Sequence, residues 1–337
     1  MNFDSGRQHY YSLDDLSTYT QTSEIYSPYC LPANYSNFMN WSSPNKVIIQ
    51  GITESEAAFY AVQMKAYGTD VVAGVSSGQG GTTVGDIPVF DLVEQVLEVT
   101  DRIDTSLIFV SPYQVLDAAI EAIATGISRV IILTPNVPPL DTIRLIKYAQ
   151  VNNTLLLGPG SEGIMIPEQV WLGKLQPQFY QPGKVGLITT SRDLSYEVAA
   201  ELNQAKIGQS MVISLGNDRI IGSKLPQWLS ILNEDPHTEA IVSIGKTIQE
   251  TEEIVAYCKH LGSDKPIVCY TAGLKTPQER TFQDAVTIIS NHLSASIPAV
   301  NQERSIISKL KKAGIKIAKR PSEIPPMLTE MFNSKVS

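Results

Sequence analysis

Histidine and cysteine, the side chains that most often carry nucleophilic or metal chemistry, are few in this chain of 337 residues. Their spacing matches no metal-binding motif, and three cysteines do not form an even-numbered disulfide framework. The sequence therefore predicts no metal site and a reducing compartment. The residues concerned are His9, His237, His260, His292, Cys30, Cys258 and Cys269.

Glycines and polar side chains gather where apolar segments end. One such turn begins at Gly51 and contains Thr53, and another runs from Ser76 past Gln79. The first turn reads G-x-T-E-x-x-A, which lacks the glycine spacing of a dinucleotide-binding loop. A dehydrogenase is therefore a poor fit.

A third turn, residues 189–193, reads T-T-S-R-D and precedes a helical segment. The hydroxyl groups of Thr189 and Ser191 can donate hydrogen bonds, and Arg192 is cationic. Unpaired N–H groups at a helix start also attract anions. Weak anion binding at this turn therefore remains open.

Apolar strands that alternate with amphipathic helices position these turns. One series covers residues 46–158 and a second covers 184–273. Continuous apolar strands between such helices indicate parallel sheets covered on both faces. We predict two α/β domains, residues 45–163 and 185–337, joined by a proline-rich linker at 164–184.

Residues 1–44 form a tyrosine-rich arm that differs from the rest of the chain. The arm has neither the basic start and apolar centre of a secretory signal nor the arginine content of a transit peptide. Two interpretations remain open: an arm that is disordered or packed along its own domain, and an arm that binds a partner protein.

The overall charge excludes some partners. Lys and Arg number 26 against 34 Asp and Glu, a formal net charge of -8, which opposes nucleic-acid binding. No apolar run approaches the roughly 20 residues that a membrane span needs. The sequence predicts a soluble cytoplasmic protein without nucleic-acid partners.

The chain resembles the α subunit of succinyl-CoA synthetase over about residues 46–328, in order and with few gaps. The phrases that carry the resemblance include QGIT (50–53), AYGTDVVAGV (66–75), GQGGTT (78–83), QPGKVGLI (181–188) and KPIVCYTAG (265–273).

This resemblance implies an N-terminal Rossmann-like CoA-binding domain and a C-terminal flavodoxin-like ligase domain, both with parallel sheets. It also implies a β-type partner subunit that binds nucleotide, and a histidine that carries a phosphoryl group. A homo-oligomer is the alternative association. By resemblance, the CoA pocket includes Thr53, Ser55, Ser76, Gln79, Ser111, Pro112 and Thr134.

Two residues depart from the family at its phosphohistidine. The resemblance places Asp284 at the histidine position and Lys246 at the glutamate that orients it. The two exchanged charges predict a salt bridge with charged ends within about 4 Å. Phosphorylation of Asp284 as an acyl phosphate stays open beside this.

Other departures affect anion binding. Arg192 stands at a family glycine, Gln79 stands at a family lysine, and Glu54 and Glu56 enter the CoA loop. Acids in a first helical turn are favoured by the helix dipole. We therefore expect the two glutamates to fill the anion site and to weaken CoA binding.

Three functional interpretations follow. The first is a non-catalytic scaffold or regulatory partner, a pseudoenzyme of the family. The second is the α subunit of an ATP-dependent acyl-CoA (succinate–CoA) ligase that binds CoA and works with a β-type subunit. The third is a module that binds another small anion or nucleotide in the altered first-domain pocket.

Overall fold

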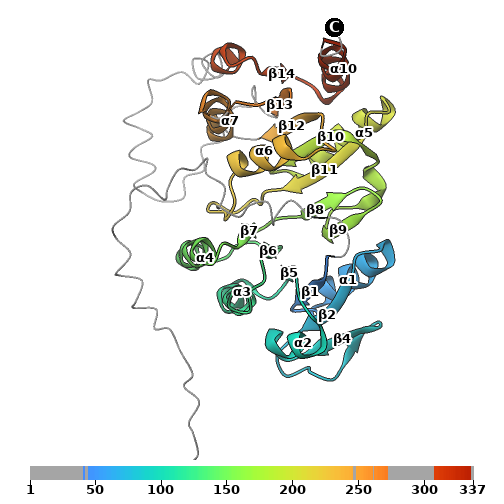
Figure 1. Ribbon diagram of the computed structural model, residues 1–337, viewed down its shortest axis with the longest axis vertical. Helices are drawn as coiled ribbons and strands as arrows, with labels where there is room; N and C mark the ends of the chain where they lie inside the picture. Colours follow the sequence, from blue (N-terminus) through green and yellow to red (C-terminus); the bar gives the residue numbers. More distant parts are fainter. Residues whose placement is uncertain (1–40, 42–44, 246–247, 261, 272–306, 335–337) are drawn as a thin grey trace, which may run out of the picture.

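The computed structural model describes residue 41 and residues 45–245, 248–260, 262–271 and 307–334. Figure 1 shows two α/β domains stacked along the long axis, each built around its own sheet. The predicted pair of α/β domains is confirmed. Within the described residues, no helix is long and apolar enough to cross a membrane.

The first sheet has seven strands in the order β3-β4-β2-β1-β5-β6-β7, and only the β3–β4 pair is antiparallel. Its strands are β1 (Val47–Gln50), β2 (Val71–Val75), β3 (Thr83–Val84), β4 (Ile87–Phe90), β5 (Thr105–Ile108), β6 (Arg129–Ile132) and β7 (Leu155–Leu157). Its helices are α1 (Ser55–Tyr67), α2 (Val93–Val99), α3 (Val115–Ala124) and α4 (Pro139–Val151).

Both faces of this sheet are covered, as its continuous apolar strands require. Along β1, Val47 and Ile49 belong to one buried cluster and Ile48 belongs to the other. Helix α1 covers the first of these faces, whereas α2, α3 and α4 cover the second. Buried apolar side chains on both faces therefore fix the position of β1 and of the loop that follows it.

The second sheet also has seven strands, in the order β14-β13-β12-β10-β11-β8-β9. Its strands are β8 (Gly163–Ile166), β9 (Val170–Gly173), β10 (Pro182–Thr189), β11 (Gln209–Ser214), β12 (Ala240–Gly245), β13 (Ile267–Thr271) and β14 (Lys316–Ala318). The second domain contains helices α5 (Arg192–Gln204), α6 (Leu225–Glu234), α7 (Ile248–His260) and α10 (Ile324–Ser334).

The expectation of wholly parallel sheets is wrong, because each sheet also contains antiparallel pairing. Strands β8 and β9 form an antiparallel hairpin, and β8 pairs antiparallel with β11. This hairpin comes from residues 163–173, mostly within the stretch predicted as a linker. A Cβ on Gly163 would overlap the carbonyl oxygen of Leu172, so the two backbones approach closely. Such short glycine-bounded strands carry little periodicity, which is why the sequence did not reveal them.

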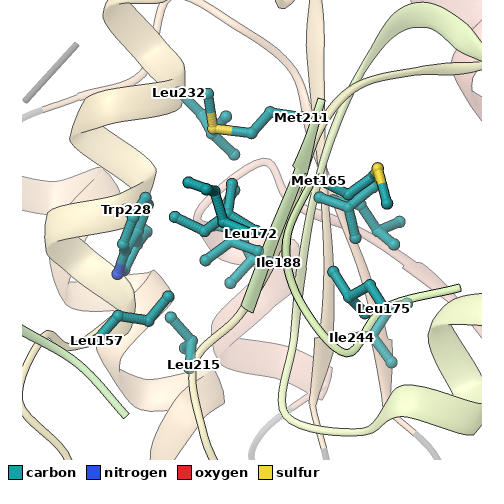
Figure 2. Packing of buried hydrophobic residues seen from close by; sticks show 14 of the residues in the cluster. Leu157, Met165, Leu172, Leu175, Ile188, Met211, Leu215, Trp228, Leu232 and Ile244 are labelled. Carbon is teal, nitrogen blue, oxygen red and sulfur yellow. The ribbon is translucent and has the colours of Figure 1, made fainter. Parts of the chain in front are cut away.

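The β8–β9 hairpin also contacts helix α1 of the first domain. The Thr69 hydroxyl donates to the Trp171 carbonyl oxygen at 2.8 Å, and the Trp171 N–H donates back at 3.2 Å. Tyr60 of α1 packs its ring edge to face with Trp171, at 6.1 Å between centroids. Farther along, Leu157 of β7 belongs to the same buried cluster as Leu215 and Trp228 (Figure 2). The cores of the two domains are therefore continuous.

Trp41 adds a further contact at this junction. Its side chain is 2% exposed and lies 6.1 Å from the Trp228 ring, measured between centroids. The Arg129 guanidinium lies 4.7 Å from the centroid of the Trp41 ring, within reach of a cation–π contact. Trp41, which falls inside the predicted arm, thus packs between a strand of the first domain and a helix of the second.

Candidate functional site

The candidate site lies at the carboxyl ends of β1, β2, β5 and β6, where α/β proteins commonly bind ligands. Gly51 begins the first loop with φ +83°, and a Cβ there would lie 2.9 Å from the backbone nitrogen of Val110. The loop therefore requires glycine. Two residues on, Thr53 Oγ1 and Ser76 Oγ lie 2.6 Å apart, so the β1 and β2 loops are hydrogen-bonded.

The loop after β2 satisfies much of its backbone internally. The Gln79 N–H donates to the Ser76 carbonyl at 3.1 Å, and the Gly80 N–H donates to Asp91 Oδ1 at 2.9 Å. The Thr82 N–H donates to the Gln79 carbonyl. Ligand contacts from this loop would therefore come chiefly from side chains, among which the Gln79 amide is exposed.

The N-terminus of α1 is open. Glu54 occupies the N-cap position with no side-chain capping bond, and its side chain is exposed. Glu56 instead lies with Oε1 3.6 Å from Lys174 Nζ. The expectation that these carboxylates fill the anion site is wrong, because one does not cap the helix and the other turns to a lysine far away in sequence. Within the described residues, the N–H groups of Ser55, Glu56 and Ala57 at the start of α1 receive no side-chain capping bond and can bind a ligand.

The remaining predicted pocket residues lie on the next two loops of the same edge. The Ser111 hydroxyl donates to Gln114 Oε1 at 2.8 Å, beside Pro112. The Thr134 hydroxyl donates to the Val110 carbonyl at 2.7 Å and so joins the β6 loop to the β5 loop. All seven predicted pocket residues therefore lie on loops, or on the helix start, at one edge of one sheet.

This arrangement presents hydroxyl groups, an amide and the positive end of a helix, which together suit a phosphate-bearing ligand. Within the described ranges, no three His, Cys, Asp or Glu side chains are grouped so as to hold a metal ion.

A second candidate element is the turn at residues 189–193, before α5. The Ser191 N–H donates to Thr189 Oγ1 at 2.8 Å, and the Thr189 hydroxyl donates to the Ser191 carbonyl at the same distance. Arg192 is the first residue of α5, and its guanidinium lies 3.7 Å from Glu162 Oε2 and 3.5 Å from Asp193 Oδ1. The arginine at this turn is therefore already paired with two carboxylates.

Glu162 is the unusual member of this group. Burial raises the pKa of its carboxyl, whereas Lys174 and Arg192 oppose that shift. Its Oε2 atom is buried and accepts no hydrogen bond within the part of the chain that the structure describes. The charged form of Glu162 is thus stabilised mainly by two cations, Lys174 directly after β9 and Arg192 at the start of α5.

Lys246 and Asp284, with the salt bridge expected between them, lie outside the described residues, as do His9 and His292. His237 lies in a turn, where its N–H donates to Asp235 Oδ1 at 3.2 Å.

Sequence reasoning missed Glu162 and Lys174, which connect the starts of α1 and α5. Both lie in the stretch that lacks strand and helix periodicity. Only the pairing of distant residues reveals them: Glu56 with Lys174, and Glu162 with Arg192.

Comparison with known families matches both halves of the chain. Residues 42–136 match the CoA-binding domain, and residues 182–296 match the succinyl-CoA ligase like flavodoxin domain. A succinate–CoA ligase [ADP-forming] subunit alpha 2 from Archaeoglobus fulgidus is 33% identical over 288 residues, which cover 85% of this chain and 97% of that protein. A malate–CoA ligase subunit alpha from Methylorubrum extorquens is 38% identical over 249 residues, which cover 72% of this chain and 83% of that protein.

Solved structures share the fold. The ATP citrate lyase from Methanothrix soehngenii, solved with citrate and coenzyme A, superposes with a TM-score of 0.71 at 15% identity. The match covers 89% of this chain but 52% of that one, so this chain spans about half its length. An acetyl-coenzyme A synthetase from Korarchaeum cryptofilum gives a TM-score of 0.62 at 18% identity and covers 85% of this chain and 59% of that one.

Proposed function

Because the chain belongs to the α-subunit family of succinate–CoA ligases, we propose that it is the CoA-binding α-type subunit of an acid–CoA ligase and acts with a β-type subunit. The acid is a small dicarboxylate, since relatives are named for succinate and malate. A cytoplasmic location is part of the proposal.

The open N-terminus of α1 is the observation that carries this proposal. Its N-cap residue makes no side-chain capping bond, while Thr53 and Ser76 lie 2.6 Å apart beside it. Helix N–H groups and hydroxyls arranged in this way favour the phosphates of CoA. Glu56 lies against Lys174, which reduces the repulsion that an unpaired carboxylate would exert.

Isothermal titration of the full chain with CoA tests this function. We expect a dissociation constant on the order of micromolar, and about 5- to 10-fold weaker binding for Ser76→Ala, because one hydroxyl contact is lost. Ser128→Ala is the matched control, since that hydroxyl lies at the opposite edge of the same sheet, where it donates to the Asp104 carbonyl. Absence of CoA binding by wild type would overturn the proposal.

A second titration addresses the two carboxylates. Glu54→Gly combined with Glu56→Gln removes two negative charges near the open helix end, so CoA should bind more tightly than it does to wild type. Unchanged affinity would show that these charges do not limit binding. Recovery of binding only in this variant would instead favour a pocket adapted to another small anion or nucleotide.

A non-catalytic scaffold or regulatory subunit is the second candidate function. Its structural support is the pairing of Arg192 with Glu162 and Asp193. The resemblance adds the placement of Arg192 at a family glycine, and of Asp284 and Lys246 at the family's phosphohistidine and orienting glutamate positions. Under this candidate, association with a β-type subunit or with a second copy persists without turnover. The tyrosine-rich arm, residues 1–44, is then a candidate protein-binding segment.

A further inference from the structure

A loop of the second domain places a carboxylate on the backbone of the first. Asp218, which follows β11, accepts the Asn136 N–H through Oδ1 at 2.9 Å and the Val137 N–H through Oδ2 at 3.0 Å. Each carboxylate oxygen of Asp218 therefore accepts one hydrogen bond, and the two donors are successive backbone N–H groups. Charge-assisted hydrogen bonds of this bidentate kind are stronger and more directional than single neutral ones.

The two donors belong to a preformed backbone turn. Asn136 has φ +62°, in the left-handed region, and successive N–H groups in such a turn converge on one side to make an anion-binding concavity. The next two residues, Pro138 and Pro139, begin α4 and have no N–H groups to add. The concavity therefore offers two donors, which matches the two oxygens of one carboxylate.

The loop that carries Asp218 is itself tightly fitted. A Cβ on Gly160 would overlap the Asn217 side-chain oxygen, and a Cβ on Gly216 would overlap the Pro159 carbonyl oxygen. Beyond Asp218, the Gly222 N–H donates to the Gly158 carbonyl at 2.7 Å. The loop after β11 thus packs closely against the segment that follows β7, and this packing places the Asp218 carboxylate in the concavity.

We propose that the Asn136 and Val137 N–H groups form a carboxylate-binding nest that Asp218 occupies as an internal ligand, and that this occupancy couples the second domain to the pocket loop at residues 134–138. The coupling runs through Thr134, whose hydroxyl donates to the Val110 carbonyl at 2.7 Å. Removing the Asp218 side chain empties the nest, and a free monocarboxylate of suitable size, such as formate, then binds there. The nest itself goes beyond the proposed function, whereas the coupling to CoA rests on it.

Hydrogen exchange on the full chain tests the nest without using CoA. In Asp218→Ala, we expect the Asn136 and Val137 amides to exchange at least about 10-fold faster than in wild type, because their acceptors are lost. Added formate should restore slow exchange in this variant, whereas an equal concentration of chloride should not. Asp104→Ala is the matched control: Asp104 accepts the Lys46 N–H at 2.8 Å at the other edge of the sheet, so its loss should leave the two nest amides unchanged.

Equal rescue by chloride, or unchanged exchange in Asp218→Ala, would overturn the nest. If Asp218→Ala does not fold, Asp218→Asn provides the test, since its amide keeps one acceptor oxygen and still occupies the nest. One of the two amides should then exchange faster, and formate should have no effect. Slow exchange of both amides in Asp218→Asn, or rescue of this variant by formate, would contradict the proposal.

CoA titration tests the coupling separately. Asp218→Ala should bind CoA about 5-fold more weakly than wild type, and formate should recover the loss. Equal CoA affinity in the two proteins would reject the coupling while leaving the nest in place. If wild type binds no CoA but formate-specific rescue of exchange is seen, the proposed function fails and the nest stands.

Discussion

Helices α1 and α5 both begin at the carboxyl edge of a sheet, yet the charges around their first turns differ. Helix α1 has Glu54 at its N-cap and Glu56 in its first turn, where the helix dipole favours acids, and Glu56 is turned toward Lys174. Helix α5 begins with Arg192, which the dipole disfavours, and Glu162 and Asp193 hold that arginine in ion pairs.

By resemblance, the start of α1 belongs to the CoA loop and the start of α5 to the family's phosphate-binding turn, so this difference separates two parts of the proposed reaction. The start of α1 keeps free helix N–H groups and hydroxyls for an anionic ligand, whereas the start of α5 directs its cation to the protein's own carboxylates. Under the proposed function, CoA binding and phosphoryl transfer can therefore change independently. Four experiments test that separation.

Under the non-catalytic candidate, replacing the residues that the resemblance places at the family's phosphoryl carrier should have the largest effect. In the complex with a β-type subunit, Asp284→His together with Lys246→Glu should raise the ATP-dependent ligase rate by at least about 100-fold, because a nucleophilic imidazole is supplied. Asp284→Asn is the control and should give no gain. A wild-type complex that turns over as fast as the double variant would reject the non-catalytic candidate.

At the α1 end, Gly51→Ala should impair both stability and ligand binding. Its added Cβ would lie 2.9 Å from the Val110 backbone nitrogen at φ +83°, a strain of about 1–3 kcal/mol in the free energy of unfolding. CoA affinity should fall more than about 10-fold because the loop must shift. Urea unfolding and titration measure the two effects.

Gly68→Ala is the matched control, since Gly68 caps the other end of α1 at φ +111° with no atom within 4 Å of the added Cβ. It should lose about 1 kcal/mol of stability with no loss of CoA affinity. Equal loss of affinity in both variants would mean that CoA binding does not depend on the shape of the β1 loop.

At the α5 end, Glu162→Gln should release Arg192 for an external anion. Sulfate, which keeps its charge over the accessible pH range, should bind about 3- to 10-fold more tightly to the variant than to wild type. In wild type the same gain should appear as the pH falls toward the raised pKa of Glu162. Glu162→Gln/Arg192→Ala should lose the gain, and a double variant that keeps it would assign the anion to other groups.

The smallest effect concerns stability against pH. Because burial raises the folded-state pKa of Glu162 above its ordinary value of 4.5, the folded protein binds this proton more tightly than the unfolded chain. That contribution is present at pH values below the unfolded pKa and is lost as the pH rises through the folded pKa. The unfolding free energy of Glu162→Gln relative to wild type should therefore rise with pH across this window. A difference in unfolding free energy that does not change with pH would show that burial does not disfavour the charged form of Glu162.

Local patterns made the two sheets predictable, because apolar runs such as residues 47–50 and 240–245 must be covered on both faces. The β8–β9 hairpin was missed, since its strands are only four residues long and each has a glycine at one end. The pocket loops followed from the resemblance, but the rotation of Glu56 toward Lys174 did not. Such contacts join residues far apart in sequence, and periodicity carries no information about them.

The positions of the three tryptophans make their fluorescence a probe of the domain junction. Trp41 and Trp228 face each other between the domains, Trp171 lies against Tyr60 of α1, and all three are at most 5% exposed. No tryptophan fluorescence therefore arises from a remote surface. The emission should be blue-shifted in the assembled chain, and any separation of the domains should appear as a red shift before helical circular dichroism is lost.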